Sequence, residues 1–354
     1  MVAFPAILIQ NKVDAAHVGV AFACDVIGGI SMLLLLTRVV GKFGIMSTIR
    51  LAAMLYCVAI LVIYFYCGFL WWISLVFLMG LCWVCYVITR QSWLNMLLTD
   101  EKRGMVLGLF SMLISAGVAL GPLIVKEFGA LNYRSFVASA ILVLLSLLCV
   151  EQLRHLPQPQ IKAERIPLKT FFKNNPRCFL ARFVLDFCGY CLSYFTVIFG
   201  SLIGLSYEKS GLLVTAYMAS GFVDVIVGAL LNRLSPYRFI KIGFLICIAS
   251  FLLVAFCYKS YILLFICYFC FGAGVACIFV SVYKIANEDY GKNELVAANA
   301  TFQLIGSLGS LCACLIGGLL IQIFGLYGFP ITIVGCCILY LYFLVYYEKS
   351  KVGS

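Results

Sequence analysis

Eleven apolar segments divide the chain, and each is long enough to cross a lipid bilayer as a helix. They cover residues 17–37, 46–66, 70–94, 104–126, 133–151, 178–203, 211–232, 238–258, 261–284, 295–323 and 328–347. A spanning helix needs about 20 mainly apolar residues. Apolar residues make up 64% of the chain and charged residues 11%, whereas soluble domains hold roughly 45–50% and 25%. The sequence therefore predicts an all-α polytopic membrane protein.

The first ten residues, Met1–Gln10, are also apolar, but they span only about half a bilayer at roughly 1.5 Å per residue. They lack the charged start and the cleavage site of a signal peptide. We interpret them as the outer end of a twelfth helix whose beginning is missing. A short interfacial segment is the alternative.

An internal repeat divides the chain into two similar halves. One set of residues recurs at a single constant offset: Gly121, Leu123, Phe128 and Gly129 return as Gly317, Leu319, Phe324 and Gly325. The longest polar stretch, residues 152–176, lies between the halves and holds four prolines and several basic residues. Because proline stops helices, we predict a linker at 152–176 between an N-terminal bundle (1–151) and a C-terminal bundle (177–354).

The net charge of +11 is distributed unevenly over the predicted loops. Eighteen lysines and arginines fall on the side of the 37–50 turn, whereas five fall on the other side, namely Lys12, Lys126, Arg134, Lys209 and Lys259. This is the positive-inside bias of multi-span proteins. It predicts that the linker and the C-terminus are cytoplasmic, and it implies no nucleic-acid partner.

Two turns at corresponding places in the halves share a motif. The first reads Thr37-Arg38-Val39-Val40-Gly41-Lys42-Phe43-Gly44, and the second, from Gly228 to Arg238, retains Gly228, Asn232, Arg233 and Arg238. Both resemble the G-x-x-x-D-R-x-G-R-R loop of the major facilitator superfamily (MFS), between its second and third and its eighth and ninth helices. In the first copy, Thr37 replaces the glycine and Gly41 the aspartate.

A third element resembles a fifth-helix signature of the antiporter branches of that superfamily. It comprises Gly108, Gly117, Gly121 and Pro122, with Val125 and Lys126 where the signature closes with two glycines. Glycines let helices approach closely, so packing alone and a role in setting transport direction both stay open. The resemblance implies two pseudo-symmetric six-helix bundles, a bacterial inner-membrane transporter similar to drug or sugar efflux proteins, and a monomer.

Few ionisable residues lie inside the predicted helices, where each costs about 2.5–3.5 kcal/mol on insertion scales. Arg182 and Asp186 are four residues apart and share a helix face with Tyr190. In the family that the chain resembles, the first, fourth, seventh and tenth helices line the central cavity. We hypothesise that Asp186 is shared between Arg182 and Arg90 across the halves and helps to close an inner gate. The alternative is a local Arg182–Asp186 pair with Arg90 extending to the surface.

Two further carboxyl groups, Asp25 and Asp224, lie inside the 17–37 and 211–232 segments. Desolvation favours the protonated form of such a group, which a proton-coupled carrier requires. A structural carboxyl, hydrogen-bonded to a neighbouring helix, is the alternative for each. Gln91, Asn299 and Gln303 add polar groups that suit a small polar or amphipathic solute, although amides also bridge packed helices.

Other classes of protein find little support in the sequence. The chain has no nucleophile–base set, no HExxH motif and no phosphate-binding G-x-x-x-x-G-K-[ST] loop. Two histidines do not predict a zinc site, and nothing indicates a cofactor. We expect a secondary active transporter, proton-coupled and working by alternating access, rather than an enzyme. The alternative is a non-transporting membrane sensor or a decayed, truncated transporter paralogue.

Overall fold

A computed structural model describes residues 3–65, 67–97, 113, 117–118, 120–156, 167–231, 235–289 and 295–352 of the chain. In these residues every regular element is a helix. The N-terminal elements are α1 (Ala3–Gln10), α2 (Ala15–Phe43), α3 (Ile45–Val62), α4 (Phe69–Leu97) and α6 (Tyr133–Glu151). The later elements are α7 (Leu168–Asn174), α8 (Pro176–Leu202), α9 (Tyr207–Ala219), η1 (Ser220–Phe222), α10 (Val223–Leu230), α11 (Pro236–Cys257), α12 (Tyr261–Asp289), α13 (Leu295–Phe324), η2 (Gly325–Tyr327) and α14 (Gly328–Val352).

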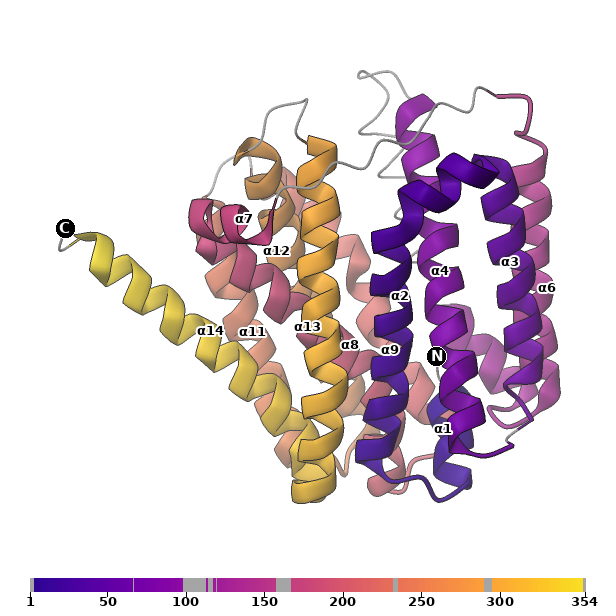
Figure 1. Cartoon of the computed structure of the whole chain (residues 1–354). Helices are drawn as coiled ribbons and strands as arrows, with labels where there is room; N and C mark the ends of the chain where they lie inside the picture. Colours follow the sequence, from indigo (N-terminus) through magenta and orange to yellow (C-terminus); the bar gives the residue numbers. More distant parts are fainter. Residues whose placement is uncertain are drawn as a thin grey trace.

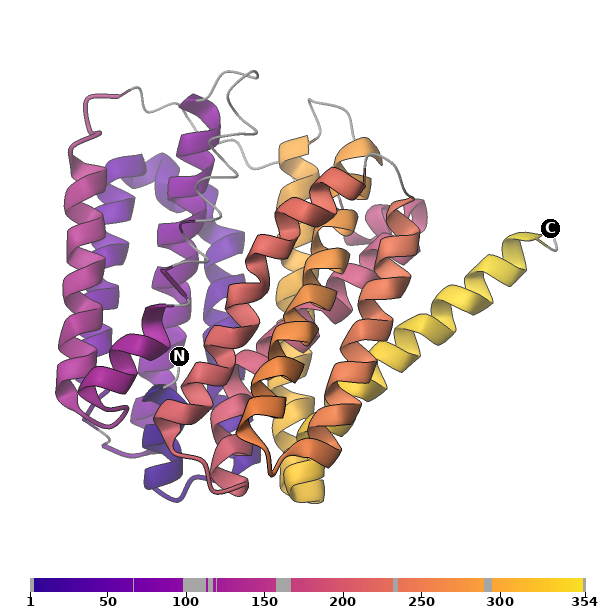
Figure 2. The ribbon, with the colours of Figure 1, turned by 180° about the vertical axis from the view of Figure 1, so that it is seen from behind.

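The helices form two bundles that stand side by side (Figure 1). One bundle holds α2, α3, α4 and α6, and the other holds the helices from α8 onward. Helices α2 and α13 meet between them. Helix α14 leans away from the rest of its bundle, and the view from behind shows the same tilt (Figure 2). This is the all-α polytopic membrane fold that the apolar segments predict.

Nine stretches of the described residues are long and apolar enough to cross a membrane. One of them, Thr301–Lys349, runs over most of both α13 and α14. The predicted segment 104–126 lies partly outside the described residues, and its last part, 120–126, belongs to a helical stretch that continues to residue 128. The predicted segment 211–232 is a helix interrupted by the 3-10 turn η1. The linker contains a short helix, α7, that its prolines did not predict.

Helix ends follow from capping residues in the sequence. The Asp14 carboxylate accepts a hydrogen bond from the backbone N–H of His17 at 2.8 Å and so begins α2. The Asn175 side chain accepts one from the N–H of Cys178 at 3.1 Å and begins α8, with Pro176 in its first turn. Gly44, at φ 79°, permits the tight turn from α2 to α3.

Glycines allow the closest contacts between helices. A Cβ built on Gly28 of α2 would overlap the carbonyl oxygen of Phe77 in α4, and one built on Gly80 of α4 would overlap that of Asp25. Between the halves, a Cβ on Gly19 of α2 would overlap the carbonyl oxygen of Cys314 in α13. Without a hydrophobic driving force in lipid, such backbone approaches supply much of the packing attraction.

We call the end of the molecule that holds Gly44, Asn175 and Ser235 the basic end, since exposed lysines and arginines gather there; it is uppermost in Figure 1. The other end, with Asp14 and Gly325, is the opposite end. One buried apolar cluster spans both halves, whereas a separate one, including Met32, Met46 and Val150, belongs to the basic part of the N-terminal half alone.

Contacts that join the halves lie toward the opposite end. The backbone N–H of Ala16 in α2 donates to Gln322 Oε1 of α13 at 3.1 Å. The N–H of Ala130 reaches Glu208 Oε1 of α9 at 3.5 Å. Two ion pairs described at the basic end, Arg50–Glu151 and Lys241–Glu348, each lie within one half. The described contacts therefore join the two halves more closely at the opposite end.

Candidate functional site

A buried ion pair lies inside the C-terminal half. Arg182 Nη2 is 2.7 Å from Asp186 Oδ2, and the two side chains are 5% and 20% exposed. The same guanidinium nitrogen donates to Gln303 Oε1 of α13 at 2.9 Å. These three residues form the charged site, in which the Arg182–Asp186 pair that the sequence analysis selected meets Gln303, which it selected separately. Arg182 and Asp186 are four residues apart on α8, and Gln303 lies on the neighbouring helix α13.

Aromatic rings surround the guanidinium of Arg182. Its carbon Cζ lies 5.0 Å from the ring centre of Phe302 in α13 and 5.5 Å from that of Tyr283 in α12. Cation–π attraction at this range is worth about 0.5–2 kcal/mol, the more so where water is excluded. Phe302 is fully buried. The rings and the carboxylate together offset the cost of keeping a charge inside the bundle.

The backbone of α13 gives the ion pair its space. A Cβ built on Gly306 would overlap the Asp186 carboxylate and lie 2.8 Å from Arg182 Nη2. One turn further along, a Cβ on Gly309 would overlap the carbonyl oxygen of Phe183. Helices α8 and α13 therefore pack directly against each other at the charged site, and the sequence analysis did not select Gly306.

Arg90 contacts the N-terminal half in this conformation. Its Nη1 lies 3.2 Å from Tyr86 Oη and 3.3 Å from Ser146 Oγ of α6. Its guanidinium sits over the Tyr86 ring at 4.7 Å. The local Arg182–Asp186 pair is therefore formed here, and pairing of Arg90 with Asp186 across the halves stays a prediction.

Asp25 meets the other half of the molecule. Tyr194 Oη of α8 donates to Asp25 Oδ2 at 2.8 Å. The sequence analysis selected Asp25 and Tyr190 but missed Tyr194. The signal was available, because 182, 186, 190 and 194 continue one four-residue spacing along α8.

Asp224 is half-buried in the first turn of α10, directly after η1. It therefore lies directly beyond the break that η1 makes between α9 and α10. Lys284 of α12 donates from Nζ to the carbonyl oxygen of Leu231 at 2.8 Å, just beyond the end of α10. A cation here satisfies a carbonyl that the helix end leaves open.

The motif residues lie mostly at the basic end. Gly41 and Lys42 are exposed in the last turn of α2, Gly228 is in α10, and Arg238 is exposed in α11. Gly117, Gly121 and Pro122 are helical, and a Cβ on either glycine meets no described atom within 4 Å. Asn232, Arg233 and Gly108 lie outside the described residues, as do the side chains of Gln91 and Asn299.

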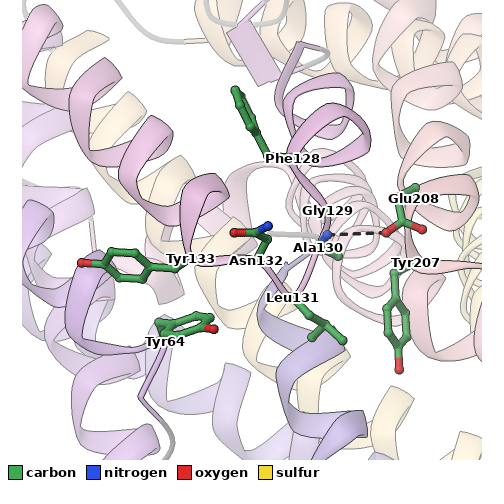
Figure 3. Close-up of a pocket in the computed structure, with 9 residues that line it drawn as sticks. All are labelled: Tyr64, Phe128, Gly129, Ala130, Leu131, Asn132, Tyr133, Tyr207 and Glu208. Carbon is green, nitrogen blue, oxygen red and sulfur yellow. Dashed lines mark hydrogen bonds between the residues drawn. The ribbon is translucent and has the colours of Figure 1, made fainter.

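A pocket of about 520 Å³ opens at the opposite end, between the halves. Figure 3 shows Tyr64, Asn132 and Tyr133 of the N-terminal half facing Tyr207 and Glu208 of the C-terminal half across the Ala130–Glu208 contact. Tyrosines are common at membrane–water interfaces, because the apolar ring can contact lipid while the hydroxyl group contacts water. In the described part of the chain, no group of three or more His, Cys, Asp or Glu residues is placed to hold a metal ion.

Comparisons with known proteins agree with this architecture. Solved structures that resemble the chain include the nucleoside transporter NupG, in a mutant form, with a TM-score of 0.79, 13% identity, and coverage of 96% of this chain and 93% of that one. Another is a bacterial homolog of the human lysosomal transporter Spinster, in an inward-facing and occupied conformation, with a TM-score of 0.75, 15% identity, and coverage of 99% and 92%. No curated protein matches the chain. The family model of the Major Facilitator Superfamily matches residues 1–257 and 178–353, so the chain belongs to that superfamily.

Proposed function

We propose that the chain is a secondary active transporter that moves a small polar or amphipathic solute by alternating access of its two halves. The observation that carries this proposal is the charged site, Arg182–Asp186–Gln303, inside an apolar bundle. Ionisable residues at membrane depth are costly and usually serve a substrate or ion pathway. In transporters built from repeats, the site lies between the halves near the bilayer midplane.

The distribution of contacts supports the alternating mechanism. Contacts between the halves gather toward the opposite end, at Gly19 with Cys314 and at Ala16 with Gln322. Under the orientation that the positive-inside bias predicts, this end faces outward and the basic end faces the cytoplasm of a bacterial cell. The described conformation then corresponds to one that admits solute from inside, and rocking of the halves exposes the site to the other side.

Proton coupling is part of the proposal. Asp186, Asp25 and Asp224 are half-buried carboxyl groups of the described helices. An anionic solute and the Asp186 carboxylate would compete for Arg182, so binding of such a solute at Arg182 would favour protonation of Asp186. Arg90 is the further cation that we expect to approach Asp186 when the basic end closes.

Nucleosides are the first solute class to test. NupG is by name a nucleoside transporter and resembles this chain over almost its whole length. The charged site holds the two kinds of group that a base and a ribose need, namely an aromatic ring (Tyr283) and hydrogen-bonding side chains (Gln303 and Asp186). Sugars and amphipathic solutes are the next classes in the same assay.

The experiment compares cells that make the wild-type protein, Asp186→Asn protein, Arg90→Ala protein or none, with and without a protonophore. Asp14→Asn is the matched control, because it makes the same carboxyl-to-amide change outside the bundles. We expect only the wild type and the control to change the cellular level of a labelled nucleoside or another solute, and the protonophore to abolish that change. If Asp186→Asn and Arg90→Ala both leave transport and its pH dependence intact, the site assignment is wrong. Identical profiles in all strains, with protein present in the membrane, would favour the non-transporting sensor.

A further inference from the structure

A hydrogen bond crosses between the two halves well inside the molecule. Asp25 lies about 15 Å along α2 from its first residue, and its Oδ2 accepts from Tyr194 Oη of α8 at 2.8 Å. Tyr194 is 3% exposed. Hydrogen bonds that involve a carboxyl group in a water-poor interior are among the stronger ones in proteins. This contact therefore joins the halves by a directed bond as well as by packing.

An aromatic stack holds the Tyr194 ring in place for that bond. Phe22, one turn before Asp25 on α2, stacks on Tyr194 with ring centres 4.0 Å apart and an interplanar angle of 18°. Phe22 is 1% exposed. Both α2 residues thus engage the same tyrosine, Phe22 through its face and Asp25 through its carboxyl oxygen. The pair forms a compact contact that a small rotation of α2 against α8 would break.

The N-terminal half supports Asp25 from behind. A Cβ on Gly80 of α4 would overlap the Asp25 carbonyl oxygen and lie 2.8 Å from Asp25 Oδ1. The backbones of α2 and α4 therefore touch at this residue. Asp25 cannot move toward its own half, so a displacement of α2 is transmitted to the hydrogen bond with Tyr194.

The face of α8 that ends at Tyr194 begins at the charged site. Arg182, Asp186, Tyr190 and Tyr194 follow each other at four-residue spacing, so they form one row along the helix. The rings of Tyr190 and Tyr194 are 5.5 Å apart between centres. One row of side chains thus links the C-terminal ion pair with the N-terminal carboxyl group.

We infer that Asp25 and Tyr194 form a releasable latch between the halves, with Tyr194 as a positioning residue that ties closure of the opposite end to the face of α8. The inference rests on the proposed function only where it connects the latch with solute binding at the charged site. The latch itself predicts a change of conformation that needs no solute. When the latch opens, α2 and α13 separate and the opposite end gains access to water.

The test is hydrogen–deuterium exchange, followed by mass spectrometry, on the full chain in lipid nanodiscs. Tyr194→Phe keeps the stack on Phe22 and removes the hydroxyl, and Asp25→Ala removes the acceptor. We expect each to raise exchange about tenfold in peptides covering 15–25 and 311–324, as loss of one hydrogen bond to a carboxyl group predicts. The double variant should exchange no faster than the faster single variant, because both remove the same bond.

Two matched variants separate the latch from general loosening. Tyr268→Phe removes another buried tyrosine hydroxyl, which lies 3.1 Å from Thr196 Oγ1 within the C-terminal half, and it should leave those peptides unchanged. Asp25→Asn retains an oxygen acceptor and should exchange like the wild type. The inference is overturned if Tyr194→Phe exchanges like the wild type or if Tyr268→Phe has the same effect. Because no solute is added, this result is independent of whether Asp186→Asn transports.

Discussion

Each half of the molecule holds one arginine at a similar depth, yet their surroundings differ. Arg90 in α4 and Arg182 in α8 both lie about 10 Å from the basic end of their helix. Arg90 is half-buried over the Tyr86 ring and near two hydroxyl groups. Arg182 is 4% exposed and paired with a carboxylate. Full burial of a guanidinium requires an opposite charge, which Asp186 supplies to Arg182.

Removing Arg182 should have the largest effect. Arg182→Ala leaves the Asp186 carboxylate buried without its cation, which in other proteins costs about 3–5 kcal/mol. We expect a large loss of thermal stability in detergent and a loss of transport. Arg90→Ala should cost less, because Arg90 is half-buried whereas Arg182 is almost wholly buried. Equal losses for the two variants would show that the halves hold their arginines in the same way.

Adding a methyl group beside the ion pair should have the next largest effect. Gly306→Ala places a Cβ against the Asp186 carboxylate, and overpacking of this kind costs about 1–3 kcal/mol. Gly335→Ala in α14 is the matched control, because a Cβ there meets nothing within 4 Å. Thermal unfolding of both variants checks the prediction. It is wrong if the Gly306 variant is no less stable than the control.

Removing one hydroxyl next to Arg90 should have a smaller effect. Tyr86→Phe keeps the ring under the guanidinium but removes the contacts with Arg90 at 3.2 Å and with Ser146 Oγ at 2.7 Å. We expect a loss of about 1 kcal/mol in the free energy of unfolding. Tyr342→Phe, at an exposed tyrosine of α14, serves as the control. No difference between the two would mean that the hydroxyl contacts contribute little and that the ring carries the interaction.

The smallest effect is expected for a charge outside both bundles. The hydrogen bond from the backbone of His17 holds the pKa of Asp14 below its usual value of 3.8. A carboxyl group whose pKa is lower in the folded state stabilises that state at pH values above its unfolded pKa. This contribution is lost as the pH falls through the folded pKa. Asp14 is exposed, so after screening the charge is worth about 0.2–1 kcal/mol.

Asp14→Asn keeps a side-chain cap and removes the charge. It should therefore be slightly less stable than the wild type at pH 7, with a difference that shrinks as the pH falls below 3.8 and through the lowered pKa of Asp14. Thermal unfolding at several pH values measures this difference. A difference that persists at low pH would assign the effect to capping geometry instead of charge. The size of the difference at pH 7 gives the effect of an exposed charge, with which the effects of the arginine variants are compared.

Much of the fold could be predicted from the sequence because lipid imposes one local rule. An apolar stretch must satisfy its own backbone hydrogen bonds, so it becomes a helix of predictable length. The predicted segment 133–151 coincides with α6, and 178–203 differs from α8 by one or two residues at each end. The break at η1 was not predicted, although it contains the pair Ser220–Gly221, and helices kink at such pairs.

The site was only partly predictable, for a different reason. Arg182 and Asp186 are neighbours on one helix, so their spacing alone indicated the pair. Gln303, Gly306 and Tyr194 act through contacts between helices, and no local pattern specifies which residue of one helix faces which residue of another. Helix α7 was missed because Phe171 is buried against the C-terminal half, at 6.0 Å from Phe302 between ring centres, a contact made across a long separation in sequence.

The amino-acid sequence by itself predicts a membrane protein of two helical bundles with charged residues inside them. It can do so because helix formation in lipid and the distribution of charge over the loops depend on short segments of the sequence. Which groups meet became clear in three dimensions: Arg182 with Asp186 and Gln303, Arg90 with Tyr86, and Asp25 with Tyr194. The contacts of Arg182 with Gln303 and of Asp25 with Tyr194 join different helices, so they depend on how helices that carry glycines pack together. Docking is a property of whole surfaces, and a linear pattern does not contain it.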